Sequence, residues 1–397
     1  MRCIICDGET ELCLDLNKQP LANELLVNVD DQYDQYPLGL EYCKNCGHGQ
    51  LSYFVDPGKL FKNYLYASGT SNTLGIYFSD FASALVKKHG NTISILEIAS
   101  NDGSFLSKLI GSGVHKCIGI DPAENLVKIA NDAGIETVCD FFPSTKIVDK
   151  YDVVIAMNVC AHNPDPISFL TGIREVLKEG GIAYIQTSQA LMLNSGQFDT
   201  IYHEHYSFFT VSSMREACNR VGLSLSNYEL TNIHGVSSIF HISKSIQVSP
   251  DLFNHGISKD LAILKDVKIE NPDDVYREFN HLAMKTISDT TAILSKYKAL
   301  GYKIALAGVA AKALTFYHAA NLECDLFIDE ATLKVGRYVP GIEVPIGKFD
   351  SLDPNSKYLV IIGAWNFFEE IREKLKRANP TTNMLFLQYF PEVRLIA

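Results

Sequence analysis

The chain lacks three features, each of which would point to a particular class of protein. No apolar run approaches the ~18 residues that a membrane-spanning helix needs, and the N-terminal stretch MRCIICDGET has no signal-peptide core. Basic residues are also in the minority, because 35 Lys and Arg stand against 46 Asp and Glu, which leaves no positive field to attract phosphates. These absences predict a cytoplasmic protein that binds neither membranes nor nucleic acid.

The composition that is present suits a globular protein with more than one domain. Of the 397 residues, 47% are hydrophobic and 20% are charged, which is enough apolar material to bury sizeable cores. At a prior of about 150 residues per domain, a chain of this length is expected to form two or three domains.

Four of the ten cysteines follow a metal-ligand pattern. Cys3 and Cys6 form one C-x2-C pair, and Cys43 and Cys46 form another. Two such pairs can aim four thiolates at one point and complete a tetrahedral zinc site. The alternative is a pair of redox dithiols, but a redox pair usually opens a helix after a strand, and Cys3 lies too near the N-terminus for that. We therefore predict structural zinc, with no open coordination position for catalysis.

Alternating strands and helices follow from residue 93 onward. The pattern predicts strands at 93–98, 117–120 and 137–139, with helices at 105–110 and 123–133 between them. This alternation indicates a parallel sheet with crossover helices. Ligands of such sheets bind at the carboxyl ends of the strands.

The residues that follow these strands indicate the kind of ligand. The first turn, EIASNDG, keeps only Gly103 of a glycine-rich loop, so a pyrophosphate cradle is not supported. Asp121 ends the second strand and could hold ribose hydroxyls, and Asp140 after the third could face an adenine amino group. S-adenosylmethionine fits because it brings a cation and a ribose but no phosphate; an NAD site with a degenerate loop, or no cofactor at all, are the alternatives. The candidate cofactor-binding residues are Glu97, Ser100, Asn101, Gly103, Asp121, Pro122, Asp140, Phe141, Asn158 and His162.

The stretch IYHEHYSFF, residues 201–209, places two histidines around one glutamate. A metal site is disfavoured because the spacing is not H-E-x-x-H. An acid–base role suits histidine, whose ordinary pKa of about 6.5 leaves a neutral nitrogen available, although a lone histidine is more often structural. If the segment is extended, His203 and His205 point to one side and Glu204 points to the other.

Several longer motifs occur in order along the chain, among them YLYASGTSNT, LEIASNDGSFL, GIDPAENLVKIA, FDTIYHEHYSFF and HGVSS. In these motifs the chain resembles the sugar C-methyltransferases that act on nucleotide-linked 4-ketosugars, such as the 3-C-methyltransferase of tetronitrose biosynthesis. The resemblance covers nearly the whole chain and implies an α/β fold in three parts. These are a small zinc-binding module (1–72), a central Rossmann-like class I methyltransferase domain (73–240) and a second Rossmann-like domain that helps to bind the sugar nucleotide (241–397).

The same resemblance implies roles for individual residues. It assigns the base that removes a proton beside the ketone to His205, and it places Tyr202 and Glu204 in the same pocket. Tyr66 matches a tyrosine near the sugar, and a phenol there can donate a hydrogen bond to an enolate oxygen.

The C-terminal third reads as a second α/β unit, with strands at 303–309, 325–329 and 358–365 and a helix at 310–321. A mostly helical stretch at about 261–298 is expected to connect and brace the two units. At the start of helix 310–321, Lys312 is a candidate for binding a diphosphate; the alternative is an ordinary solvated lysine. The candidate substrate-binding residues are Lys312, Gly308, Thr315 and His234.

The chain departs from the pattern of the family at several positions. Leu306 and Ala313 stand where the first turn of the C-terminal unit usually has glycines. Val236, Ile239, Ser188 and Gln189 replace residues expected around the sugar.

Taken together, these features predict an S-adenosylmethionine-dependent C-methyltransferase that acts on a nucleotide-linked 4-keto-deoxysugar, as a monomer or small homo-oligomer. The alternatives are an O- or N-methyltransferase on a related sugar or small molecule, and a non-catalytic protein that binds a sugar nucleotide.

Overall fold

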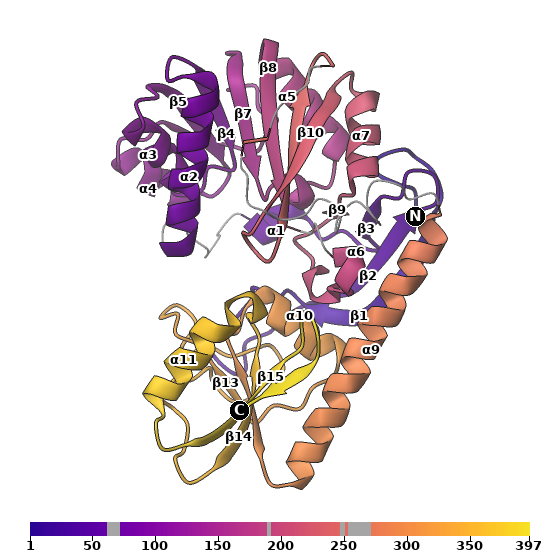
Figure 1. The fold of residues 1–397 in the computed structure, drawn as a ribbon, viewed down its shortest axis with the longest axis vertical. Coiled ribbons are helices and arrows are strands. Elements are labelled where there is room, and N and C mark those ends of the chain that lie inside the picture. The colour runs from indigo at the N-terminus through magenta and orange to yellow at the C-terminus, as the bar shows by residue number, and fades with distance from the viewer. Residues whose placement is uncertain (62–71, 189–191, 247–250, 253–270) are drawn as a thin grey trace.

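The computed structural model describes residues 1–61, 72–188, 192–246, 251–252 and 271–397. Tyr66 and Gln189 lie outside these ranges. Figure 1 shows a central α/β domain above a C-terminal α/β domain, with the N-terminal strands between them and the long helix α9 along one side.

The N-terminal strands form an antiparallel sheet in the order β1-β2-β3-β9. Its fourth strand comes from a distant part of the chain, because Gln50 of β3 pairs with Ser207 of β9. The histidine-containing stretch therefore ends as a strand of the N-terminal sheet, although it lies in the range predicted for the central domain. The elements are β1 (Thr10–Pro20), β2 (Gln35–Cys43), β3 (Gly49–Leu51), α1 (Pro57–Phe61) and β9 (Ser207–Phe208).

The central domain is built on a sheet in the order β10-β11-β8-β7-β4-β5-β6. Strands β4 to β8 pair in parallel, and the β10–β11 hairpin joins β8 antiparallel. The predicted strand–helix alternation is thus confirmed. The elements are α2 (Asn72–His89), β4 (Ser94–Ile98), α3 (Ser104–Gly111), β5 (Lys116–Asp121), α4 (Glu124–Asp132), β6 (Thr137–Cys139), β7 (Tyr151–Met157), η2 (Cys160–His162), α5 (Pro166–Val176), β8 (Leu177–Thr187), α6 (Met192–Ser195), η3 (Phe198–Thr200), α7 (Val211–Arg220), β10 (Ser224–Thr231) and β11 (Ser237–Ser243).

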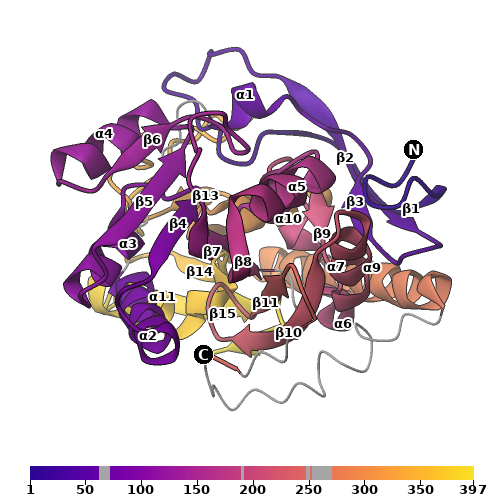
Figure 2. The ribbon, with the colours of Figure 1, turned by 90° about the horizontal axis from the view of Figure 1, so that it is seen from above.

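Both faces of the central sheet are buried, which explains why its strands are almost continuously apolar. Ile95 and Ile155 pack with α2 and α3 on one face, whereas Leu96 and Val154 pack with α5 and α7 on the other. Figure 2 shows these two pairs of helices on opposite sides of the sheet. The carboxyl ends of the strands remain as the place where a ligand can enter.

The C-terminal domain has a second, smaller sheet in the order β13-β12-β14-β15-β16, parallel except for β16. The predicted helical connection is confirmed from Pro272 onward, and its part at 261–270 lies outside the described residues. The elements are α9 (Pro272–Ala299), β12 (Lys303–Ala307), α10 (Ala311–Ala319), β13 (Leu326–Ile328), β14 (Lys357–Ile362), η4 (Trp365–Phe367), α11 (Phe368–Ala378), β15 (Asn383–Gln388) and β16 (Arg394–Ile396).

The N-terminal sheet shares a hydrophobic core with the C-terminal domain. Leu40 and Leu51 belong to the same buried cluster as Phe279 of α9 and Leu306 and Phe316 of the C-terminal domain. The parts of the chain are therefore packed together through common apolar contacts rather than joined by open linkers.

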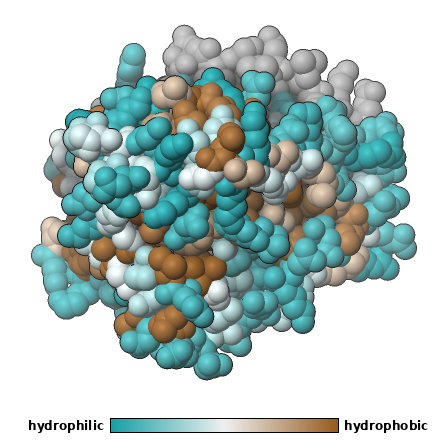
Figure 3. Space-filling view, turned by 90° about the horizontal axis from the view of Figure 1, so that it is seen from below, coloured by the Kyte–Doolittle hydropathy of each residue, from teal (hydrophilic) through white to brown (hydrophobic). Residues whose placement is uncertain are grey.

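In the part of the chain that the structure describes, no helix combines the length and apolarity needed to cross a membrane. On the face of the molecule shown in Figure 3, hydrophobic side chains are interrupted by hydrophilic ones.

Candidate active site

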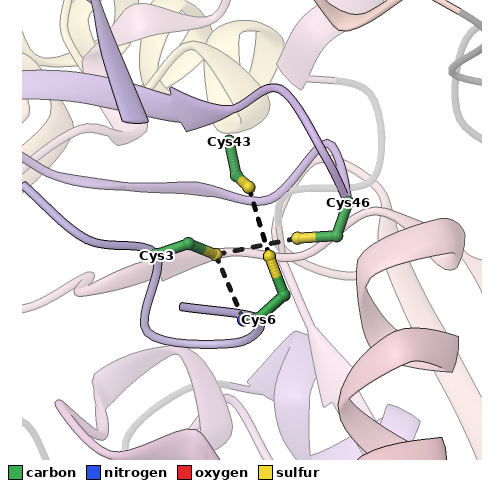
Figure 4. A group of neighbouring side chains, drawn as sticks. All are labelled: Cys3, Cys6, Cys43 and Cys46. Atoms are coloured by element: carbon green, nitrogen blue, oxygen red, sulfur yellow. Dashed lines mark hydrogen bonds between the residues drawn. The ribbon is translucent and has the colours of Figure 1, made fainter. Parts of the chain in front are cut away.

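The four patterned cysteines meet at one point near the N-terminus (Figure 4). Their sulfur atoms all lie within 4.8 Å of one another, with 3.6 Å between Cys3 and Cys46 and 3.3 Å between Cys6 and Cys43. Four sulfurs bound at about 2.3 Å around a tetrahedral zinc ion would stand about 3.8 Å apart. The cluster therefore fits a structural zinc ion, as predicted.

The two C-x2-C turns have the same backbone conformation. Asp7 and Gly47, which follow the second cysteine of each pair, have positive φ values of 58° and 70°. Each donates its N–H to the carbonyl oxygen of the first cysteine of its pair, at 2.9 Å in both turns. Gly8 packs closely on the second turn, because a Cβ there would stand 2.6 Å from the Asn45 side chain and 3.2 Å from the Cys43 sulfur.

These turns are tied to the rest of the molecule. The Gln50 side chain accepts from the N–H of Ile4 and donates to the carbonyl of Arg2, and it lies on the strand that pairs with β9. The Tyr276 hydroxyl of α9 donates to the carbonyl of Gly47 at 2.9 Å. The metal site thus supports both α9 and the strand that follows the two histidines.

The loop after β4 is organised by Asp121 at the end of the neighbouring strand. Its two carboxylate oxygens accept the N–H groups of Asn101 and Ala123, each at 2.9 Å. Ala99, Asn101 and Gly103 all have positive φ, so the loop turns sharply. It also packs closely on β5, because a Cβ at Gly119 would stand 2.2 Å from the Ser100 hydroxyl.

Several buried polar atoms at the carboxyl ends of β4, β7 and β8 have no hydrogen-bond partner among the described residues. They are Oε2 of Glu97, Oγ of Ser100, Oδ1 of Asn158 and Oγ1 of Thr187. Burial and the nearby carboxylates of Asp121 and Asp102 raise the pKa of Glu97 well above its usual range. Such oxygens suit a ligand with a positive charge and several hydrogen-bond donors, and S-adenosylmethionine is a ligand of that kind.

Other predicted cofactor residues lie at the rim of this region. The Asp140 carboxylate accepts from Ser144 at 2.7 Å and forms an ion pair with Lys146 at 3.3 Å. The neighbouring Phe141 ring is 43% exposed and could cover a planar group. Pro122 follows β5, and its carbonyl oxygen lies 4.0 Å from the Cys139 sulfur.

The histidine-containing stretch is a turn and not an extended strand, because the N–H of His205 donates to the carbonyl of Tyr202 at 2.8 Å. The arrangement expected for an extended segment, with both histidines on one side, therefore does not apply. His203 contacts the N-terminal module, with Nε2 3.3 Å from the carbonyl oxygen of Tyr36. Glu204 also contacts this module, because it accepts a hydrogen bond from the side chain of Asn23.

His205 lies among aromatic rings where the parts of the chain meet. Its ring centroid is 4.1 Å from that of Tyr202 and 4.8 Å from that of His162, which follows β7. Its Nδ1 lies 2.7 Å from the carbonyl oxygen of Thr200. A carbonyl only accepts, so Nδ1 carries the proton in the neutral ring and Nε2 keeps its lone pair. Burial lowers the pKa of His205 well below its usual range, and the neighbouring His162 lowers it further.

Lys312, in the first turn of α10, approaches this group from the C-terminal domain. Its ammonium group stands 5.2 Å from the ring centroid of Trp365. Burial lowers the pKa values of His205 and His234, and the charge of this ammonium group lowers them further. Gly308 has a φ of 81° in the turn before α10. The Thr315 hydroxyl donates to the carbonyl of Ala311 in its own helix.

Two residues that the sequence did not assign complete this side of the site. The Asp199 carboxylate is fully buried and accepts the indole N–H of Trp365 at 2.8 Å. Asp199 lies in the FDT motif before the histidines, and Trp365 is the single tryptophan of the chain. Both features could have marked these residues as candidates from the sequence. Of the positions that depart from the family pattern, Ile239 belongs to the core beside α2 rather than to this group.

Comparison with protein families agrees with the three-part architecture. The model of a zinc-binding domain matches residues 3–61, that of a "Methyltransferase domain" matches residues 74–227, and that of a "C-methyltransferase C-terminal domain" matches residues 254–390. Together with the sheet order and the loop after β4, these matches define an S-adenosylmethionine-dependent methyltransferase with a structural zinc site.

The relatives narrow this class further. The C-methyltransferase NovU of Streptomyces niveus is 25% identical over 413 aligned residues, which cover 100% of this chain and 96% of NovU. The ubiquinone biosynthesis O-methyltransferase of Aeromonas salmonicida is 23% identical over 39% of this chain and 73% of its own. A tRNA U34 carboxymethyltransferase of Dichelobacter nodosus is 27% identical over an alignment that covers 31% of this chain and 41% of that protein. The chain is a C-methyltransferase related to NovU over its whole length, and the resemblance to the C-methyltransferases is confirmed.

Proposed function

We propose that the enzyme methylates the carbon next to the ketone of a nucleotide-linked 4-keto-deoxysugar, with His205 as the base. The observation that carries this proposal is the contact between Nδ1 of His205 and the carbonyl of Thr200, which leaves Nε2 as a proton acceptor. The contact of His205 with His162, which follows β7 of the central sheet, supports the proposal, as do the family motifs of the chain.

In the proposed reaction, Nε2 of His205 removes the proton from the carbon beside the ketone, and the electron pair of that C–H bond forms the enolate. The phenol of Tyr202 donates a hydrogen bond to the enolate oxygen. When bound, S-adenosylmethionine supplies an electrophilic methyl group on a positively charged sulfur. The enolate carbon would take this methyl group, with the new C–C bond forming as the S–C bond breaks and S-adenosylhomocysteine as the leaving group.

The surroundings of His205 suit this role. Because burial lowers its pKa, the imidazole is neutral at neutral pH and can accept a proton. On the side of the nucleotide, Lys312 and the N-terminus of α10 offer positive charge to a diphosphate. Glu204 accepts a hydrogen bond from Asn23, which ties the histidine-containing stretch to the N-terminal module.

The test is incubation with a panel of nucleotide-linked 4-ketosugars and ¹³C-methyl S-adenosylmethionine, followed by NMR to locate the label. We expect the label on a ring carbon next to the ketone, and deuterium from solvent at that carbon when S-adenosylhomocysteine replaces the methyl donor. Label on oxygen or nitrogen would establish O- or N-methylation instead. A zinc-loaded, folded protein that fails to bind S-adenosylmethionine would be a non-catalytic binding protein.

A further inference from the structure

The short turn η3 anchors the histidine-containing stretch in the C-terminal domain. Phe198 is fully buried, with its ring 5.6 Å from that of Phe316 and 5.9 Å from that of Phe390. The next residue is Asp199, and the one after it is Thr200, whose carbonyl contacts His205. A displacement of Asp199 would therefore be transmitted to the proposed base within a few bonds.

The Asp199 carboxylate is only partly satisfied by hydrogen bonds. Oδ2 accepts from the indole of Trp365 at 2.8 Å and from the Tyr389 hydroxyl at 3.4 Å. Oδ1 is buried and has no partner among the described residues. Burial raises the pKa of Asp199 to about 6, and the positive charge of Lys312 opposes this rise, so the lysine helps to keep the carboxylate ionised.

Trp365 links this carboxylate to Lys312. The lysine ammonium stands over the indole ring, 5.2 Å from its centroid, while the N–H of the same indole points to Asp199. A cation is attracted to the electron-rich face of an indole, and an anion that accepts the N–H polarises the ring so that its face becomes more negative. The turn at Gly235 closes over this ring, because a Cβ there would stand 3.1 Å from the indole.

We propose that Asp199 is a positioning residue that acts through Trp365, holding Lys312 charged and in place for the diphosphate while its own backbone fixes the carbonyl that orients His205. This role rests on the proposed function for the parts played by Lys312 and His205. Trp365 is the single tryptophan of the chain, so its fluorescence reports directly on this site.

The first test uses the fluorescence of Trp365 during titration with a nucleoside diphosphate. In the wild type we expect a change in emission that saturates. Asp199→Asn keeps the size of the side chain and removes its charge, and we expect it to weaken nucleoside diphosphate binding by roughly tenfold to a hundredfold and to shift the starting emission. Asp152→Asn is the matched control, because Asp152 binds Ser94 and Lys178 at the opposite end of the central sheet.

The outcomes separate the two proposals. No response to nucleoside diphosphate in the wild type would overturn the proposed acceptor and this role with it. A wild-type response that Asp199→Asn leaves unchanged would overturn the role of Asp199 alone, because a purely structural anchor would lower thermal stability without moving the affinity of the folded protein.

A double-mutant cycle gives a second measurement, in kcat/KM for the ketosugar substrate. Trp365→Phe keeps an aromatic ring under Lys312 and removes the N–H donor. If the two residues act as one unit, each single variant should lose roughly tenfold or more, and the double variant should lose little beyond the worse of the two. If the loss of kcat/KM in the double variant equalled the product of the two single losses, Asp199 and Trp365 would act independently, and their proposed linkage would be overturned.

Discussion

The buried His205 and the partly buried His162 and His234 lie at the proposed reaction site, and all three are neutral at neutral pH. Burial lowers the pKa values of His162 and His234 to about 4, and it lowers that of His205 still more clearly below its usual range. Because the three imidazoles carry no charge, Lys312 and the sulfonium of the cofactor supply the positive charge of the site, and His205 is able to accept a proton from the substrate.

The role of His205 leads to the first prediction at this scale. His205→Asn should lower methyl transfer by at least about a hundredfold and abolish deuterium exchange at the acceptor carbon, because it removes the proton acceptor. Calorimetry should show unchanged affinity for S-adenosylmethionine. Rates come from the ¹³C-methyl assay.

His203→Asn is the matched control, since His203 contacts Tyr36 and not the proposed site. We expect it to cost stability but to retain most of the activity of the folded protein. Equal loss in both variants would contradict the assignment of the base.

At the scale of elements, the turn between β4 and α3 depends on space above β5. Gly119 has no Cβ, and the Ser100 side chain occupies that space. Gly119→Ala should push the loop away, weaken S-adenosylmethionine binding by at least about tenfold and destabilise the fold by about 1–3 kcal/mol. Calorimetry and urea unfolding measure the two effects.

Gly75→Ala in α2 provides the contrast, because nothing lies within 4 Å of the added Cβ. This change should stabilise the protein by about 0.5–1 kcal/mol, as expected for a glycine inside a helix. If the Gly119→Ala protein bound S-adenosylmethionine as tightly as the wild type, the close packing of the loop on β5 would not be needed for cofactor binding.

The elements also show what could be predicted from sequence. Strands such as β4 and β7 are mostly buried and mostly apolar, so their positions could be predicted from the sequence. Strand β9 is two residues long and carries no pattern, and its partner β3 lies far away in the sequence. The conformation around His205 depends on contacts with Thr200 and His162, which no local pattern encodes.

At the scale of the whole molecule, the zinc site supports structure far from itself. Cys46→Ser should lower the zinc content from about one ion per chain, lower thermal stability and remove most methyl transfer, because the turns hold α9 and the strand beside β9. Metal analysis, thermal unfolding and the methyl assay on the same samples check this.

Cys117→Ser is the control, because Cys117 lies in β5 and is not among the four clustered thiols. It should keep both zinc and activity. Full activity in a Cys46→Ser protein without zinc would contradict a supporting role for the metal.

The pairing of β3 with β9 has a consequence for biosynthesis. A ribosome makes the N-terminal strands first, yet the sheet is complete only after the whole of β4 to β8 has been synthesised. Phe198, which precedes β9, reaches its final surroundings later still, when Phe390 emerges near the end of the chain. The reaction site is therefore assembled late, so that a nascent chain becomes competent for catalysis only after the segment that contains Phe390 has been synthesised.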